Sequence, residues 1–207
     1  MLFTRPRAVL ALLIALPALV GTQTHVTFGA EPPQQLRTQI KLLTPFGVKG
    51  LSAGMQITEK LSGKCFSASV ASSTRPDAWR CSAGNAILDP CYQRILGDEK
   101  QLACPVNGPW SQKVVVLTLT ETLPSEPRKE TSRESTWPWA IELANGKHCS
   151  LFTGATAPVA GMRINYGCPG GCQGVGDIDR STPMWRVFFQ SENAGALEQV
   201  DVVVAWY

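Results

Sequence analysis

Few residues of this chain have the type and spacing that nucleophilic catalysis requires. A serine or cysteine nucleophile needs a base beside it. The chain has two histidines, His25 and His148, and no Gly-x-Ser-x-Gly elbow. His25 lies close to an apolar N-terminal run. We interpret His148 as a histidine of a turn or a strand edge, and the sequence predicts no catalytic residue.

Paired carboxylates are the other candidate chemistry, because two of them can hydrolyse a glycosidic bond. Asp77 and Asp89 are the first candidates for such a pair. Asp77 follows Pro76 and Asp89 precedes Pro90, so both positions are also typical of turns. Arg75, Asp77 and Arg80 could instead form a structural ion pair.

The sequence predicts no metal ion and no cofactor. Asp177 and Asp179 follow a glycine-rich stretch, but calcium takes six to eight oxygen ligands and no glutamate stands at the required distance. Zinc needs four ligands, and the cysteine spacing matches no common zinc pattern. We interpret residues 170–179 as a turn before a strand.

Three tryptophans near prolines and expected loops are possible ligand contacts: Trp110, Trp137 and Trp139. Exposed aromatic rings on a β scaffold can stack on sugar rings or anchor a protein partner. Packing in the core is the alternative. Trp185 and Trp206 fall within apolar stretches, so we expect them in the core.

Seven cysteines occur, and all of them follow residue 64. Gly63-Lys64-Cys65 and Gly146-Lys147-His148-Cys149 each begin a strand-like stretch, and a second stretch returns to Cys81 and to Cys168. Antiparallel neighbours bring such positions within reach of a disulfide. We therefore predict bridges Cys65–Cys81 and Cys149–Cys168, with Cys91–Cys104 as the remaining local pair. Cys172 is left over, and it could compete for Cys149, stay free or join another chain.

Residues 1–30 have the pattern of a secretory signal peptide. Arg5 and Arg7 precede an apolar run that is too short to cross a bilayer and that Pro17 interrupts. Residues 31–54 contain Pro32-Pro33 and end in small residues, which predicts a flexible leader. A single domain over residues 55–207 remains. Without the signal, no stretch is long enough to span a membrane.

The charge of the chain excludes some partners. The net charge is +3, but Arg5 and Arg7 belong to the signal, which leaves 17 basic against 16 acidic residues. A near-neutral surface argues against nucleic acid, which needs a basic patch. Export and many cysteines together predict an extracytoplasmic location, secreted or in the cell envelope, where disulfides form.

From residue 55 onward the sequence predicts an all-β fold. Short stretches rich in β-branched and aromatic residues alternate with Gly, Pro, Asn and Ser. We expect a disulfide-stabilised sandwich or barrel of short antiparallel strands, with a mobile surface loop over residues 124–138. The expected strands are Met55–Leu61, Cys65–Ser69, Lys113–Thr120, Trp139–Leu143, His148–Phe152, Met162–Tyr166, Trp185–Gln190 and Val200–Tyr207.

Two blocks of residues carry a family resemblance. The first runs from Gly63-x-Cys65 through Asp77-Ala-x-Arg-Cys81 and Asp89-Pro-Cys91 to Cys104-Pro105. The second includes Trp139-Ala140, Cys149, Gly154-Ala155, Tyr166-x-Cys168 and Trp185. Over residues 57–207 the chain resembles a group of exported, cysteine-containing domains of actinobacterial type. The resemblance implies an extracytoplasmic location and no particular activity. Six cysteines match its pattern and Cys172 does not.

We therefore expect a secreted domain that acts by non-catalytic binding, or as an interaction module of the cell envelope. Its ligand would be an extracellular protein or glycan. The alternative is a hydrolase of an extracellular polymer that uses Asp77 and Asp89.

Overall fold

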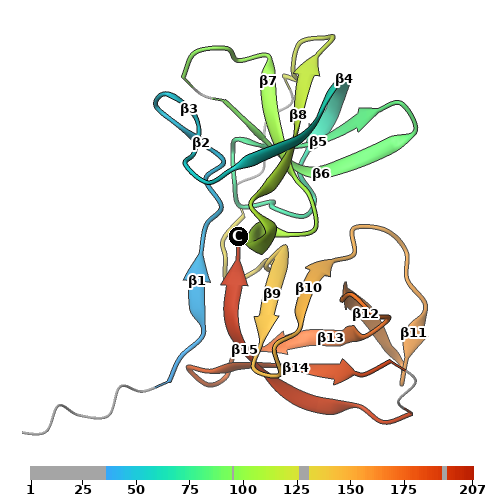
Figure 1. Ribbon diagram of the computed structural model, residues 1–207. Coiled ribbons are helices and arrows are strands. Elements are labelled where there is room, and N and C mark those ends of the chain that lie inside the picture. Colours follow the sequence, from blue (N-terminus) through green and yellow to red (C-terminus); the bar gives the residue numbers. More distant parts are fainter. Residues whose placement is uncertain (1–35, 95, 126–130, 193–194) are drawn as a thin grey trace, which may run out of the picture. The chain divides into compact units, whose positions relative to one another are not determined.

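The computed structural model describes residues 36–94, 96–125, 131–192 and 195–207. The expected export signal and the first residues of the expected leader lie outside the described residues. Within the described ranges, the regular elements are β-strands and one short 3-10 turn, η1, Pro109–Ser111 (Figure 1). The predicted all-β fold is confirmed.

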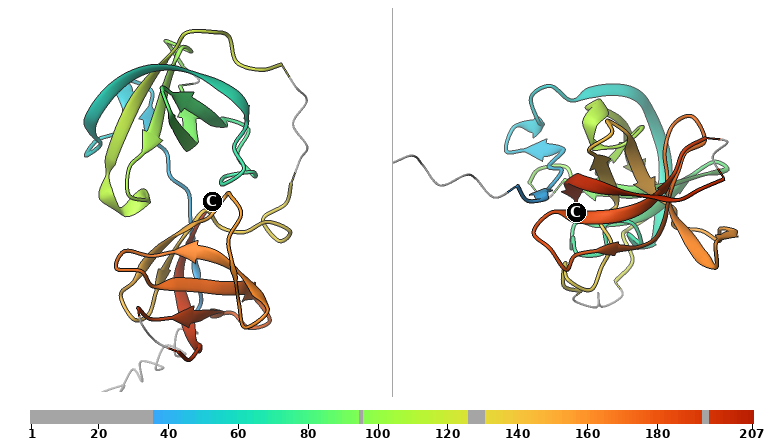
Figure 2. Two further views of the ribbon diagram at one scale, coloured as in Figure 1. Left: turned by 90° about the vertical axis from the view of Figure 1, so that its right-hand side faces the viewer. Right: turned by 90° about the horizontal axis from the view of Figure 1, so that it is seen from below.

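Five strands close into a first barrel. They are β4 Gln56–Ala68, β5 Ala78–Ala83, β6 Ala86–Gln93, β7 Gln101–Pro105 and β8 Lys113–Leu119. Neighbours are antiparallel except β4 and β8, which run parallel and close the ring. The two stretches predicted at residues 55–61 and 65–69 are one strand, β4, which curves across the barrel (Figure 2).

Side chains of alternate residues fill this first barrel, as the two-residue period of a strand requires. Val115, Leu117 and Leu119 of β8 are buried in a cluster that also contains the cysteines of two disulfides. Gly63 lies where β4 meets β5, and a Cβ atom there would stand 2.1 Å from the Ser82 carbonyl oxygen. The close crossing therefore requires a glycine.

Six further strands form a second ring. They are β9 Ala140–Leu143, β10 His148–Leu151, β12 Met162–Gly167, β13 Gln173–Asp179, β14 Trp185–Gln190 and β15 Glu198–Trp206. Each pairs antiparallel with the next, and the pairing of β15 with β9 closes the sheet. A short strand, β11 Pro158–Val159, adds to β12. Of the two predicted architectures, the structure thus has the barrel.

The segment before residue 55, for which the sequence predicted a flexible leader, contributes three strands. β1 Gln39–Lys41 pairs parallel with β15, and β2 Phe46–Gly47 and β3 Gly50–Leu51 form a hairpin. Thr38 is buried, and its hydroxyl donates to the Val202 carbonyl at 2.7 Å. Leu43 is also buried. Residues before position 55 therefore pack against the rest of the described chain.

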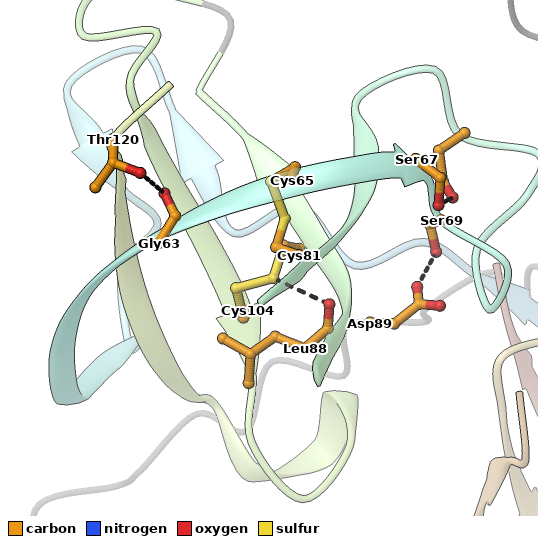
Figure 3. The surroundings of a disulfide bond; sticks show 11 residues. Gly63, Cys65, Ser67, Ser69, Cys81, Leu88, Asp89, Cys104 and Thr120 are labelled. Carbon is orange, nitrogen blue, oxygen red and sulfur yellow. Dashed lines mark hydrogen bonds between the residues drawn. A yellow bond between two sulfur atoms is a disulfide. The ribbon is translucent and has the colours of Figure 1, made fainter. Parts of the chain in front are cut away.

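The three disulfides join the pairs that the sequence predicted. Cys65–Cys81 lies in the first barrel (Figure 3), as does Cys91–Cys104. Cys149–Cys168 lies in the second. Cys172 is free and buried, and its thiol donates to the Pro169 carbonyl. Bridges of this kind form in oxidising compartments.

A third buried cluster combines residues of both rings with Leu43 of the N-terminal segment. Its buried members are Leu43, Ala71, Ala78, Tyr92, Trp139 and Ala140. Among the described residues, no helix is long and apolar enough to cross a membrane.

Candidate functional site

The three tryptophans that the sequence proposed as ligand contacts have different environments. Trp139 directly precedes β9. Its side chain is only 4% exposed and belongs to the third buried cluster. Trp110 lies in η1, where its ring is tilted against His148 at a centroid distance of 4.7 Å. Trp137 is 39% exposed. Of the three, Trp137 is the one whose side chain is exposed.

Trp137 lines a surface hollow of about 450 Å³, which we call the Trp137 groove. Its walls combine apolar side chains with hydroxyl groups and one arginine. The lining residues are Val70, Ser73, Ser135, Thr136, Trp137, Leu151, Phe152, Thr153 and Arg163. Phe152 and Val70 are exposed hydrophobic side chains like Trp137.

The indole ring of Trp137 is held in place. Its Nε1–H donates to Asp177 Oδ1 at 3.2 Å, and the Arg163 guanidinium lies 5.8 Å from the ring centroid. Arg163 is itself fixed, since it donates to Asn165 Oδ1 at 2.6 Å and to the carbonyl of Gly154 at 2.7 Å. A ring that is already ordered loses little side-chain entropy when a ligand binds.

The backbone around Trp137 is anchored as well. Arg180 donates to the carbonyls of Arg133 and Thr136, and the Thr131 hydroxyl donates to the Ser73 carbonyl at 2.9 Å. The expected mobile loop covers residues 124–138. Its residues 126–130 lie outside the described part, and its end at 131–138 is tied down by these bonds.

Tyr166 supports the same segment from the core. It is fully buried, and its hydroxyl donates to the Pro138 carbonyl at 2.9 Å. Burial raises the pKa of Tyr166 well above its usual value, so the hydroxyl keeps its proton and remains a donor. Pro138 directly follows Trp137, which means that the core of the second barrel positions the groove.

The two candidate catalytic carboxylates are separately engaged. Asp77 lies in the turn before β5, and both its oxygens accept hydrogen bonds from Arg75, at 2.8 and 2.7 Å. This is the predicted ion pair, except that Arg80 contacts a different carboxylate, that of Asp89, at 3.9 Å. Neither aspartate lines the Trp137 groove.

Asp89 does not occupy a turn, as its proline neighbour had suggested. It lies within β6, and its side chain is 4% exposed. The Ser69 hydroxyl donates to one oxygen and the Val70 amide to the other (Figure 3). Burial raises the pKa of Asp89, although the hydrogen bonds from Ser69 and Val70 and the charge of Arg80 oppose that shift. These contacts connect β6 to the turn after β4 and give Asp89 a structural role.

His148 has no nucleophile among its described contacts. Its Nε2 lies 3.7 Å from Glu142 Oε2, and its ring packs on Trp110. Glu142 also accepts a hydrogen bond from Trp206 Nε1 at 2.9 Å. In the described part of the chain, no group of three or more His, Cys, Asp or Glu residues is arranged to hold a metal ion.

The sequence analysis proposed Trp137 as a possible ligand contact and did not single out the other residues of the groove. Phe152 was expected as the end of a strand, and Arg163 was not singled out. The available signal was the group of hydroxyl residues Thr131, Ser132, Ser135 and Thr136 just before Trp137, which is typical of a polar binding surface. Val70 and Ser73 also line the groove, but they lie far from Trp137 in the sequence, so nothing in the sequence around Trp137 points to them.

Comparisons with protein-family models, with curated proteins and with solved structures gave no match for this chain. The functional assignment therefore rests on the geometry of the chain itself.

Proposed function

We propose that this chain is an exported, non-catalytic binding domain that holds a glycan of the cell envelope in the Trp137 groove. The observation that carries the proposal is an ordered, exposed indole ring surrounded by hydroxyl groups. Sugar rings present C–H faces that pack on an aromatic ring and hydroxyls that exchange hydrogen bonds with serine and threonine.

Several features support a glycan over a charged ligand. The charged groups at this groove already have partners, because Arg163 donates to three neighbouring oxygens and lies against the Trp137 ring. The remaining lining groups are neutral hydroxyls and apolar side chains. The disulfides and the resemblance to exported domains of actinobacterial type favour a location outside the cytoplasm, which is part of the same proposal.

Co-sedimentation with protein-free bacterial cell-wall polysaccharide tests this function. We expect the wild-type domain to sediment with the polymer and Trp137→Ala to bind about tenfold more weakly, since a central aromatic contact commonly carries 1–2 kcal/mol or more of binding energy. Phe66→Ala is the matched control, because Phe66 is an exposed aromatic residue outside the groove.

Two results would reject the proposal. The first is a wild-type domain that stays in the supernatant at every polymer concentration. The second is a Trp137→Ala variant that sediments as well as Phe66→Ala. A wild-type preparation that shortens the polymer would instead favour the hydrolase.

A further inference from the structure

A second region of the surface holds two basic side chains for which the described residues provide no acidic partner. The region is a pocket of about 380 Å³ on the first barrel, which we call the Arg94 pocket. Its lining residues are Phe46, Gly50, Leu51, Ile57, Lys60, Arg94, Gln101, Val116 and Thr118. No carboxylate is among them.

The strand register explains why the polar groups of this pocket meet. Lys60 of β4 pairs with Val116 of β8, and Gln101 of β7 pairs with Thr118 of β8. Val116 and Thr118 are two residues apart, so they project from the same face of β8, opposite to the core residues Val115 and Leu117. The hairpin residues Phe46 and Leu51 complete the apolar wall.

Arg94 is fixed at the edge of this pocket. Its backbone amide donates to the Gln101 carbonyl at 3.1 Å. The backbone at Gly97 lies close to the Arg94 guanidinium: a Cβ atom added to Gly97 would stand 3.1 Å from Arg94 Cζ. Gly50 approaches from the hairpin, where an added Cβ would stand 4.0 Å from an Arg94 terminal nitrogen.

The side chain of Arg94 makes no hydrogen bond with the described residues. Its Nε atom is buried and has no hydrogen-bond partner among them. Five ion pairs connect other charged side chains of the described part, and neither Arg94 nor Lys60 belongs to any of them. A guanidinium without a charged partner beside apolar groups is costly, and an anion in the pocket would pair its charge.

Arg94 also lines a neighbouring hollow of about 440 Å³ with a mostly apolar wall. Pro45, Val48 and Leu96 contribute to that wall, and Val48 and Leu96 are 80% and 58% exposed. The single carboxylate there, Asp77, is bound on both oxygens by Arg75. Arg94 is therefore a cation with apolar surface on both sides.

We propose that Arg94 and Lys60 bind the phosphate or carboxylate group of a ligand whose remaining part is apolar. A planar guanidinium matches the two oxygens of such a group, and the lysine adds a second positive charge. Gln101 and Thr118 provide neutral hydrogen-bond donors, and the apolar part of the ligand packs on Phe46, Val48 or Leu96. This site is separate from the Trp137 groove and does not depend on the function proposed for that groove.

Isothermal titration of the mature domain with hexyl phosphate, hexanoate and inorganic phosphate tests the site. We expect hexyl phosphate or hexanoate to bind more tightly than inorganic phosphate, because only the alkyl compounds can use the apolar walls. Binding by hexyl phosphate alone would identify a phosphate ligand, and binding by hexanoate alone would identify a carboxylate.

The variants Arg94→Gln and Lys60→Gln should each weaken binding of the tighter compound about tenfold, which is the loss of one charge-assisted contact. Lys113→Gln is the matched control, since Lys113 is an exposed lysine of β8 that does not line the pocket. Arg94→Lys should give an intermediate affinity, because it keeps the charge and loses the planar fork.

The proposal is overturned if neither alkyl compound binds the wild-type domain, or if Arg94→Gln and Lys60→Gln bind as well as Lys113→Gln. A purely structural role for Arg94 would have a different signature. In that case Arg94→Gln would lower the melting temperature without ligand and leave the affinity of the refolded protein unchanged.

Discussion

Tyr166 connects the core of the second barrel to the Trp137 groove through one hydrogen bond. In Tyr166→Phe the buried Pro138 carbonyl loses its donor. We therefore expect the free energy of unfolding to be about 1–2 kcal/mol lower than in the wild type. Chemical denaturation measures the difference. Tyr92→Phe is the control: its hydroxyl is also buried but lies 3.4 Å from Ser72 Oγ, so its loss should matter less. Equal losses in the two variants would contradict this account.

Asp89 should make the stability of the domain depend on pH in an unusual direction. Its pKa is raised in the folded state mainly by burial, from an ordinary value of 3.8. The folded protein then holds this proton more tightly than the unfolded chain does. The stabilisation is complete below the unfolded pKa and is lost as pH rises through the folded pKa.

Urea denaturation of the wild type and of Asp89→Asn at several pH values, from about 3 to about 7, tests this direction. We expect the wild type to lose stability relative to Asp89→Asn as the pH rises above the ordinary aspartate pKa. The variant serves as the reference because the other titrating groups are common to both proteins. If the wild type instead becomes more stable relative to Asp89→Asn over this range, the pKa of Asp89 is lowered in the folded protein.

For individual residues, the sequence allowed the pairing of the cysteines to be predicted but not the exposure of the side chains. The disulfide pairs could be predicted because paired cysteines lie on, or directly after, strands that are consecutive or nearly so. The exposure of Trp137 and the burial of Trp139 could not, because both residues flank Pro138 and have the same local sequence character. Only the tertiary structure places one ring outside and the other inside.

At the scale of the elements, the packing of β4 against β5 depends on Gly63. Gly63→Ala would bring a methyl group against the Ser82 carbonyl and close to Leu117, which forces β4 away from β5. We expect a loss of about 2 kcal/mol or more in the free energy of unfolding. The control is Gly154→Ala, since nothing lies within 4 Å of a Cβ atom there. A Gly63→Ala variant as stable as this control would disprove the close crossing.

Strand prediction succeeded where apolar and β-branched residues were dense. The expected stretches at 113–120, 185–190 and 200–207 correspond to β8, β14 and β15. β6 and β13 were missed because they contain residues that usually break strands, such as Pro90 in β6 and Gly174 and Gly176 in β13. Hydrogen bonds to neighbouring strands in a closed ring outweigh those local preferences.

For the molecule as a whole, the segment before residue 55 is expected to be part of the folding unit. A variant that begins at Ser52 lacks β1 and the hairpin and loses the burial of Leu43 and the bonds of Thr38. We expect it to be less stable than a variant that begins at Leu36 by about 3 kcal/mol or more. Thermal and urea denaturation of the two variants measure this difference.

Equal stability of the two truncated proteins would mean that residues 36–51 add nothing to the fold. A contribution from this segment could not be predicted from the sequence, because Pro32-Pro33 and the small residues at the end of the 31–54 stretch are typical of linkers. Its strand β1 is only three residues long, and it is specified by its partner β15 rather than by its own composition. The order of the strands in the two rings could not be predicted for the same reason.

The buried thiol of Cys172 can be used to measure how often the structure around it opens in the native protein. All other cysteines are bonded, so an alkylating reagent can label the native protein only when the structure around Cys172, in the turn between β12 and β13, opens far enough to admit it. The labelling rate, compared with that of an unstructured thiol, yields the free energy of this opening without any added denaturant. One residue left out of the disulfide framework thus allows local opening of the second barrel at this turn to be followed under native conditions.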